Sequence, residues 1–204
     1  MALSPAFLRA LLDAEHYHHE QIRKDTTIPY MSHLMGVSSL VLEGGGTEIE
    51  AIAALLHDAV EDAGGEPILR AIQANYGDEV ATIVEACSDA SPARGEEKPP
   101  WVTRKKVYFG HLITVGASTM LVSAADKLHN LRSIYSDYCE IGIEIFERFN
   151  TPTPKRDHVL WYYGSLRDIY ERPESAFDSR RARLFSGLTE LLERLGYVPG
   201  KFEP

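Results

Sequence analysis

The sequence predicts an all-α protein built as a single domain of about ten helices. Apolar residues recur at intervals of three and four along almost the whole chain, which is the period of an amphipathic helix. No segment alternates apolar and polar residues as a half-buried strand does. A length of 204 residues fits one domain, and a composition of 44% hydrophobic and 25% charged residues is that of a globular protein.

Capping signals mark the helices of the first half. Ser4 followed by Pro5 is an N-cap with proline at the first helical position. Thr47 and Glu50 form a capping box. Gly77 separates two shorter helical segments. We expect helices over residues 5–23, from 29 to the glycine turn at 44–46, and over 51–62, 67–76 and 78–87.

The second half begins after the loop that the sequence shows most clearly, residues 88–100, which is rich in proline, glycine and charge. A basic, aromatic helix follows, and Ser118 caps an apolar helix that should be buried until Asp126. We expect helices here over residues 102–113, 119–131, 137–149, 155–172 and 176–195.

The charge is unevenly distributed. Residues 1–100 carry 6 Lys/Arg and 17 Asp/Glu, a net charge of -11, whereas residues 101–204 carry 15 and 13, a net charge of +2. Long nucleic acids bind to clustered basic residues, so a nucleic-acid polymer is excluded as a partner. A small anionic ligand is compatible with this balance if a metal and a few cations face it.

Three features predict a cytoplasmic protein. No apolar run approaches 18 residues, which excludes a membrane span. The first twenty residues lack a basic start and contain Asp13 and Glu15, so they are not a signal peptide. Cys87 and Cys139 form no closely spaced pair, which favours a reducing compartment. The oligomeric state cannot be read from the sequence.

The segment with the most chemical content is HDAVED, residues 57–62, directly after the apolar run Ile52–Leu56. A carboxylate buried there without a partner would cost several kcal/mol, and a metal ion bound by His57 and Asp58 would remove that cost. On one continuous helix, Glu61 and Asp62 would share a face with Asp58. The alternative is a helix that simply ends at the surface, with solvated carboxylates.

Two further positions extend this possible ligand set. His33 lies early on the second expected helix, and Asp126 follows another apolar stretch. Taken alone, His33 is more often a structural histidine, and Asp126 could cap the helix or pair with Lys127 or Arg132.

The order of His33, the pair His57-Asp58, and Asp126 resembles that of the HD superfamily of metal-dependent phosphohydrolases. Within it, the chain is most similar to the hydrolase domain of the RelA/SpoT enzymes and to the stand-alone (p)ppGpp hydrolases. The similar strings are RKD at 23–25 with PYMSH at 29–33, AALLHDAVED at 53–62, YGDEV at 76–80, and AADKLHNLR at 124–132. The resemblance covers about residues 14–172, and residues 173–204 form a C-terminal helical extension beyond it.

The resemblance implies a first shell of metal ligands, which are His33, His57, Asp58 and Asp126. A set of two imidazoles and two carboxylates suits Mn²⁺ better than it suits a zinc ion in a closed structural site, which favours thiolate ligands. The metal would polarise a phosphoryl group and lower the pKa of a bound water. Glu61 and Asp62 would then position or deprotonate the attacking water.

The resemblance also implies the contacts to an anionic substrate. It places Arg23 in the substrate site, matches Lys105 to a phosphate-contacting lysine, and matches Tyr162 to a tyrosine that contacts the nucleotide. Asn130 lies one turn beyond Asp126 and would bond a ribose or phosphate oxygen. The other reading of the basic triplet around Lys105 is a solvated helix face.

The function that the resemblance implies is hydrolysis of the 3′-pyrophosphate of (p)ppGpp, which yields GDP or GTP and pyrophosphate and belongs to the stringent response. One alternative keeps the metal site but changes the substrate to another nucleotide or NADPH. A second alternative is a non-catalytic nucleotide-binding regulatory domain, which would not need the Glu61-Asp62 pair.

Overall fold

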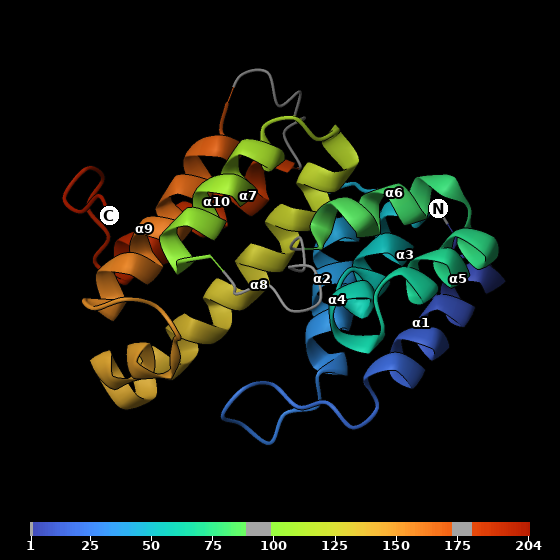
Figure 1. Ribbon diagram of the computed structural model, residues 1–204, viewed down its shortest axis with the longest axis horizontal. Coiled ribbons are helices and arrows are strands. Elements are labelled where there is room, and N and C mark those ends of the chain that lie inside the picture. The colour runs from blue at the N-terminus through green and yellow to red at the C-terminus, as the bar shows by residue number, and fades with distance from the viewer. Residues whose placement is uncertain (1, 89–98, 173–180) are drawn as a thin grey trace. The chain divides into compact units, whose positions relative to one another are not determined.

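The computed structural model describes residues 2–88, 99–172 and 181–204, and in these residues the protein is all-α, as predicted (Figure 1). The described residues form ten α-helices and one 3₁₀ helix, with no strand beyond an isolated bridge between Ile22 and Pro29. The elements are α1 (Pro5–His18), α2 (Met31–Glu43), α3 (Glu48–Leu56), α4 (Ala59–Ala63), α5 (Glu66–Tyr76), α6 (Asp78–Cys87), α7 (Trp101–Leu112), α8 (Ala117–Ile141), η1 (Gly142–Arg148), α9 (Lys155–Tyr170) and α10 (Arg181–Arg194).

The chain divides into two compact units. The first comprises residues 1–91 and 116–126, and the second comprises residues 92–115 and 127–204. Helix α8 contributes its first ten residues to the first unit and its remainder to the second. The single domain expected for residues 1–204 stays a prediction.

Helix α3 forms the centre of the first unit. Seven of its residues, Glu50–Leu56, are buried, and α3 contacts α1, α2 and α6. Its capping box is present as predicted: Thr47 Oγ1 accepts from the Glu50 backbone N–H, and the Glu50 carboxylate accepts from the Thr47 N–H at 2.6 Å. Such a cap satisfies two backbone donors that a helix start leaves open, so it fixes where α3 begins.

The start of α8 packs closely on the end of α2 within this unit. A Cβ atom at Gly46 would lie 2.6 Å from Val41 Cγ1 and 3.1 Å from Leu121 Cδ2, so only glycine fits there. The α8 residues Leu121–Ala125 are all buried, as the sequence predicts for the apolar stretch before Asp126. This packing brings Asp126 into the first unit.

The three largest differences from the predicted helix boundaries have local causes. Helix α1 ends at His18, five residues early, because the chain then turns into the bridge at Ile22. The helix expected over 51–62 begins at Glu48 and is divided by a turn at His57-Asp58. The helix expected over 137–149 does not exist as such, because α8 continues to Ile141 and a 3₁₀ helix begins at Gly142, whose φ of 66° ends the α-helix.

Some predictions fall on residues that are not described. The expected loop 88–100 includes residues 89–98, and the start expected for the last helix lies within residues 173–180. Helix α10 is described from Arg181 onward. Nothing in the structure bears on those parts of the two predictions.

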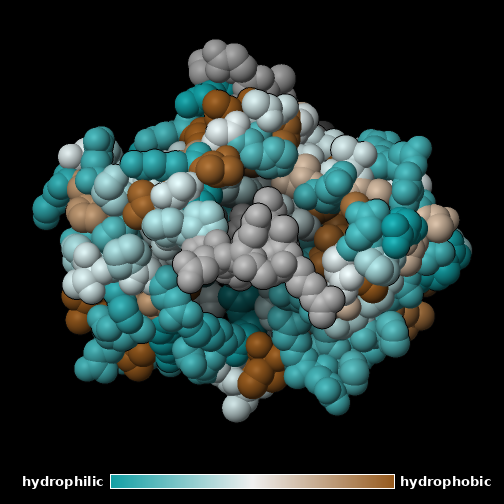
Figure 2. Space-filling view, viewed as in Figure 1, coloured by the Kyte–Doolittle hydropathy of each residue, from teal (hydrophilic) through white to brown (hydrophobic). Residues whose placement is uncertain are grey.

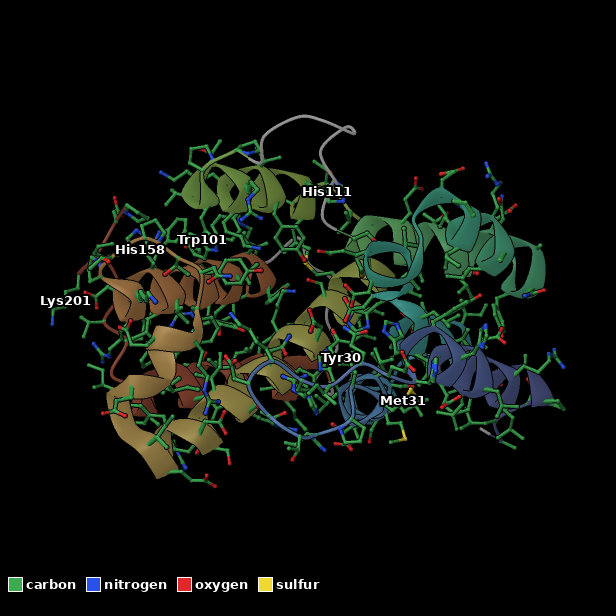
Figure 3. The ribbon with its side chains drawn as sticks, turned by 60° about the horizontal axis from the view of Figure 1, so that its bottom comes forward. Tyr30, Met31, Trp101, His111, His158 and Lys201 are labelled. Atoms are coloured by element: carbon green, nitrogen blue, oxygen red, sulfur yellow. The ribbon has the colours of Figure 1, made fainter. Side chains whose placement is uncertain are left out.

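The second unit is organised around α9, which contacts α7, α10 and η1. The ring of Tyr197 packs directly on Gly164, where a Cβ atom would lie 2.1 Å from the ring. Trp101 of α7 meets His158 of α9 with ring centroids 5.9 Å apart (Figure 3). Aromatic packing therefore joins α7 to α9.

In the ranges that the structure describes, no helix is both long and apolar enough to cross a bilayer. On the face shown in Figure 2, apolar side chains stand in small groups among hydrophilic ones. Scattered exposure of this kind is ordinary for a globular protein.

Candidate metal centre

Four predicted side chains from three segments of the first unit converge. His33 lies near the start of α2, His57 and Asp58 form the turn between α3 and α4, and Asp126 lies in α8. His33, His57 and Asp126 are buried, whereas the Asp58 side chain keeps 23% of its surface exposed. The cluster is therefore buried on most sides and open at Asp58.

The two imidazoles and the two carboxylates face one another. His33 Nε2 lies 3.2 Å from Asp126 Oδ1 and 3.7 Å from Asp58 Oδ2. His57 Nε2 lies 3.0 Å from Asp58 Oδ2 and 3.8 Å from Asp126 Oδ1. The ligand atoms of His33, His57 and Asp58 all lie within 4.8 Å of one another. Each imidazole thus contacts both carboxylates, as ligands around one cation would.

His57 is prepared to bind a metal through Nε2. Its Nδ1 lies 2.9 Å from the Ala54 carbonyl oxygen, which can only accept, so Nδ1 carries the proton. Nε2 is therefore the nitrogen that remains for a cation, and this buried atom has no hydrogen-bond partner within the described residues. A buried nitrogen left in this state is costly, and a divalent cation would satisfy it. The residues present therefore fit a divalent metal ion.

The charges of the cluster are balanced internally. Burial opposes a charge on His57, but Asp58 and Asp126 together raise the pKa of His57 well above its usual range. Burial lowers the pKa of His33. Burial alone would raise the pKa of Asp58, but His57 beside it holds that pKa at about 2. His57 must release its proton before Nε2 can bind a cation, so metal binding should release protons.

Tyr30 supports the carboxylate of Asp58. The tyrosine hydroxyl donates to Asp58 Oδ2 at 2.6 Å, and its ring lies against His33 with centroids 5.4 Å apart. Burial and the neighbouring Asp58 raise the pKa of Tyr30, so the hydroxyl keeps the proton that it donates. Figure 3 shows Tyr30 where the chain enters α2. The contact fixes the rotation of the Asp58 side chain.

We expect Tyr30→Phe to weaken metal binding by about 10–100-fold, the usual cost of removing a hydrogen bond that orients a metal ligand. Phenylalanine keeps the ring against His33, so the fold should be unchanged. Titration of the metal-free protein with Mn²⁺ measures the affinity, and Tyr17→Phe, on α1, is the control. An unchanged affinity would show that Asp58 is held without the hydroxyl.

Glu61 and Asp62 lie on α4, directly after the four-residue cluster, and both are exposed. The prediction that they share a face with Asp58 assumed one continuous helix. The turn at His57-Asp58 interrupts that helix, so the assumption does not hold. The backbone N–H of Asp62 still donates to the Asp58 carbonyl at 3.0 Å, so one helical turn joins them. Asp62 Oδ2 also accepts from the Gln21 side-chain amide at 2.9 Å.

Arg23 lies in the turn that joins α1 to α2, in the same unit as the cluster. Its backbone N–H donates to the Ile28 carbonyl at 2.9 Å, and its own carbonyl accepts from Thr26 Oγ1 at 2.8 Å. Asp25 adopts a φ of 58°, a conformation that aspartate tolerates better than most residues. These bonds give the basic turn a defined shape.

The other predicted substrate contacts belong to the second unit. Lys105 Nζ lies 4.9 Å from the centroid of the Tyr162 ring, so these two residues are neighbours. Asn130 follows Asp126 by one turn of α8. The structure thus groups the four predicted ligands in one unit and pairs Lys105 with Tyr162 in the other.

Comparison with known proteins gives this arrangement a family. The family model for the HD domain matches residues 10–144, about two thirds of the chain. The chain belongs to the HD domain family. This result confirms the predicted resemblance to HD proteins, and the matched residues include all four members of the cluster.

Two relatives show how far the similarity extends. The guanosine-3′,5′-bis(diphosphate) 3′-pyrophosphohydrolase MESH1 of Xenopus tropicalis is 35% identical over 130 residues, which are 62% of this chain and 68% of that one. A probable GTP pyrophosphokinase of Mycobacterium leprae is 30% identical over 132 residues, 62% of this chain but only 15% of that protein. The chain therefore matches most of the former and a small part of the latter.

Two solved structures share the fold. One is described as a metazoan orthologue of SpoT that hydrolyses ppGpp. The match covers 97% of this chain and 99% of that one, with a TM-score of 0.75 and 23% identity. The other, lmo0812 of Listeria monocytogenes EGD-e, has a TM-score of 0.64 and 25% identity, and the match covers 80% of this chain and 97% of that one. These matches confirm the predicted helical HD fold.

Sequence reasoning missed three residues around the cluster. Tyr30 was part of a matched string but received no role, and neither Gln21 nor His18 was singled out. The string PYMSH at 29–33 placed Tyr30 three residues before His33, which was the available signal for Tyr30. No comparable signal existed for Gln21 or His18, because their contacts are made in the folded chain.

Proposed function

We propose that this chain is a metal-dependent phosphohydrolase that removes the 3′-pyrophosphate of (p)ppGpp, yielding GDP or GTP and pyrophosphate. The observation that carries the proposal is the convergence of His33, His57, Asp58 and Asp126 into one cluster. In this cluster the buried Nε2 of His57 has no hydrogen-bond partner among the described residues. The choice of substrate is supported by MESH1, whose name states this activity and of which the chain covers 68%.

The four clustered side chains would hold the metal ion. When bound, the ion would supply Lewis-acid polarisation of a phosphoryl group and a lowered pKa for water. The mixed nitrogen and oxygen donors favour Mn²⁺ over a structural zinc ion, whose sites are rich in thiolate. Tyr30 and the Ala54 carbonyl orient Asp58 and His57 respectively, so the two adjacent ligands are preorganised.

Glu61 and Asp62 are the proposed proton-handling groups. Hydrolysis adds a water oxygen to phosphorus and breaks the bond between phosphorus and the 3′-oxygen. One proton leaves the water for a carboxylate, and one proton joins the 3′-oxygen of the nucleotide. Exposed carboxylates next to the ligand cluster are suited to the first transfer, and the protonated carboxyl group can carry out the second.

Cationic and polar side chains would bind the anionic substrate. Arg23 lies in a turn of defined shape in the unit that contains the cluster. Lys105 and Tyr162 are paired in the second unit, and Asn130 continues α8 beyond Asp126. We propose that Arg23 and Lys105 contact phosphates, Tyr162 the nucleoside, and Asn130 a ribose or phosphate oxygen. A cytoplasmic location stays a prediction.

Turnover of a nucleotide panel tests the proposal. With Mn²⁺, ppGpp should yield GDP and pyrophosphate at least about 10-fold faster than NADPH, deoxynucleotides or nucleoside monophosphates release phosphate, the discrimination that a few lost polar contacts provide. Chelation should abolish turnover, and added Mn²⁺ should restore it. A higher rate with NADPH would change the proposed substrate to NADPH and would leave the proposed metal-dependent hydrolysis unchanged. Binding without turnover of any nucleotide would favour a regulatory domain.

A further inference from the structure

We propose that His18 and Gln21 form a hydrogen-bonded relay that positions Asp62 for catalysis. This inference rests on the proposed function, because it takes Asp62 to act on the reacting water. His18 is a positioning residue in this proposal, acting through Gln21. Nothing in the resemblance or in the relatives assigns a role to either residue.

Two short contacts form the relay. His18 Nδ1 lies 2.6 Å from Gln21 Oε1, and Gln21 Nε2 donates to Asp62 Oδ2 at 2.9 Å. The relay joins the end of α1 to α4, and its second contact, between Gln21 and Asp62, spans 41 residues of sequence. All three residues belong to the first unit, which also contains the metal cluster.

The chemistry of the three groups fixes the direction of both bonds. An ionised carboxylate only accepts, so Asp62 requires the amide nitrogen of Gln21 on its side. The amide oxygen then faces His18, so His18 Nδ1 must be the donor and carries the proton. The reverse tautomer would turn the amide, and its oxygen would face the carboxylate. The tautomer of His18 thus decides whether Asp62 receives a donor.

The backbone holds Gln21 at the correct place. The Gln21 N–H donates to the His18 carbonyl at 2.9 Å, and the Gln21 carbonyl accepts from the Tyr30 N–H at 2.9 Å. Gln21 is therefore bonded to α1 on one side and to the start of α2 on the other. A glutamine side chain loses rotamer freedom when it binds a carboxylate. The backbone bonds of Gln21 and its bond to His18 already restrict the side chain, so binding Asp62 costs less conformational entropy.

The buried end of the relay is His18. Its exposed fraction is 2%, and its ring stacks on Tyr30 with centroids 5.2 Å apart and an angle of 26° between the planes. Its Nε2 is buried without a hydrogen-bond partner among the described residues. A phenyl ring would stack on Tyr30 without that unsatisfied nitrogen. What the imidazole adds is the Nδ1 proton that it donates to Gln21.

The Asp62 carboxylate needs a contact that fixes its rotamer. It lies exposed on α4, a helix of five residues that is followed by Gly64 and Gly65, both at positive φ. An exposed carboxylate on so short a helix samples several rotamers unless a contact selects one. Holding Oδ2 fixes the rotation of the carboxylate as a whole. A misplacement of about 1 Å at a reacting group can cost about 10²-fold in rate, so this constraint has a measurable value.

Two variants separate the functions of the His18 ring. His18→Phe keeps a ring for Tyr30 and loses the donor, whereas His18→Asn loses the ring but places an amide N–H close to the former Nδ1. We expect kcat with ppGpp to fall about 10-fold in His18→Phe, within the range for a displaced reacting group. His18→Asn should be faster than His18→Phe. KM and the bound-metal content should stay within about 2-fold of wild type in His18→Phe, since this variant keeps a ring on Tyr30 and removes neither a ligand nor a substrate contact.

A double-variant cycle shows whether the two residues act in series. Gln21→Leu should lower kcat to the same level as His18→Phe, and the double variant should be no slower than Gln21→Leu alone. The matched control is His19→Phe, at the adjacent exposed histidine, which should retain wild-type kcat. Independent losses that multiply in the double variant would overturn the relay.

The ring nitrogen chemistry gives a readout that does not depend on turnover. Nitrogen-15 NMR of the histidine side chains should show His18 protonated at Nδ1, with the signal assigned by its absence in His18→Phe. In Gln21→Leu the ring should lose this single tautomer. A wild-type chain that hydrolyses no nucleotide would overturn the proposed function and the relay's role with it. If the wild type is active but kcat is unchanged in His18→Phe, the relay alone is overturned. The same holds if KM or the bound-metal content of His18→Phe changes by the same factor as kcat.

Discussion

Replacing Glu61 with glutamine should lower the turnover number with ppGpp by about 10²–10⁴-fold while the bound metal stays. Glutamine has the same size as glutamate but cannot take a proton from water. Glu61 is exposed on α4 and is not among the four clustered side chains, so the metal content should not change. Rate and elemental analysis on one protein sample measure both quantities.

A matched control is available on a neighbouring helix. Glu85 is an exposed glutamate of α6, so Glu85→Gln makes the same chemical change away from the cluster and should leave turnover unchanged. Exposed substitutions of this kind usually change the free energy of unfolding by less than about 0.5 kcal/mol. Full activity in Glu61→Gln would assign proton transfer to Asp62 or to the metal-bound water alone.

Replacing Asp58 with alanine should remove metal and activity together. Asp58 Oδ2 lies 3.7 Å from His33 Nε2 and 3.0 Å from His57 Nε2, so its carboxylate faces both imidazoles. Wild-type protein purified without chelator should contain about one divalent ion per chain, and the variant should contain little. Loss of the several kcal/mol that a metal contributes to the transition state corresponds to a rate lower by about 10³-fold.

The contrast between these two variants tests the alternative that HDAVED merely ends a helix at the surface. Under that alternative, each change would cost little stability and would leave metal and rate unchanged. Melting temperature, metal content and rate measured on both proteins separate the two readings. Retention of metal by Asp58→Ala would remove Asp58 from the ligand set, whatever happens to the rate.

The sequence predicted helix starts better than helix ends. Ser4 and Thr47 are side-chain caps, so the chemistry that fixes a start is local and visible in the sequence. Helix α1 ends at His18 although residues 19–23 contain no helix breaker. What ends it is the pairing of Ile22 with Pro29, a contact made only after the chain has turned back.

A similar distinction applies to the site. His33, His57, Asp58 and Asp126 were identified from matched strings, and the structure brings all four together. The turn between α3 and α4 was not predicted, because the local sequence favours a continuous helix there. Gln21 reaches Asp62 across 41 residues, and a glutamine in a polar segment carries no sign of such a partner.

The turn at His57-Asp58 separates two tasks along the chain. The predicted ligands His57 and Asp58 lie at the end of α3, whose buried residues belong to the core, whereas the carboxylates of Glu61 and Asp62 are exposed on α4, a helix of five residues. A designer could therefore change the exposed side chains of α4 and keep both the core and the four predicted ligands. Such changes would convert the same scaffold into a metal-loaded nucleotide trap, or into a hydrolase with a different proton carrier. The modularity follows from a single interruption in what the sequence alone presents as one helix.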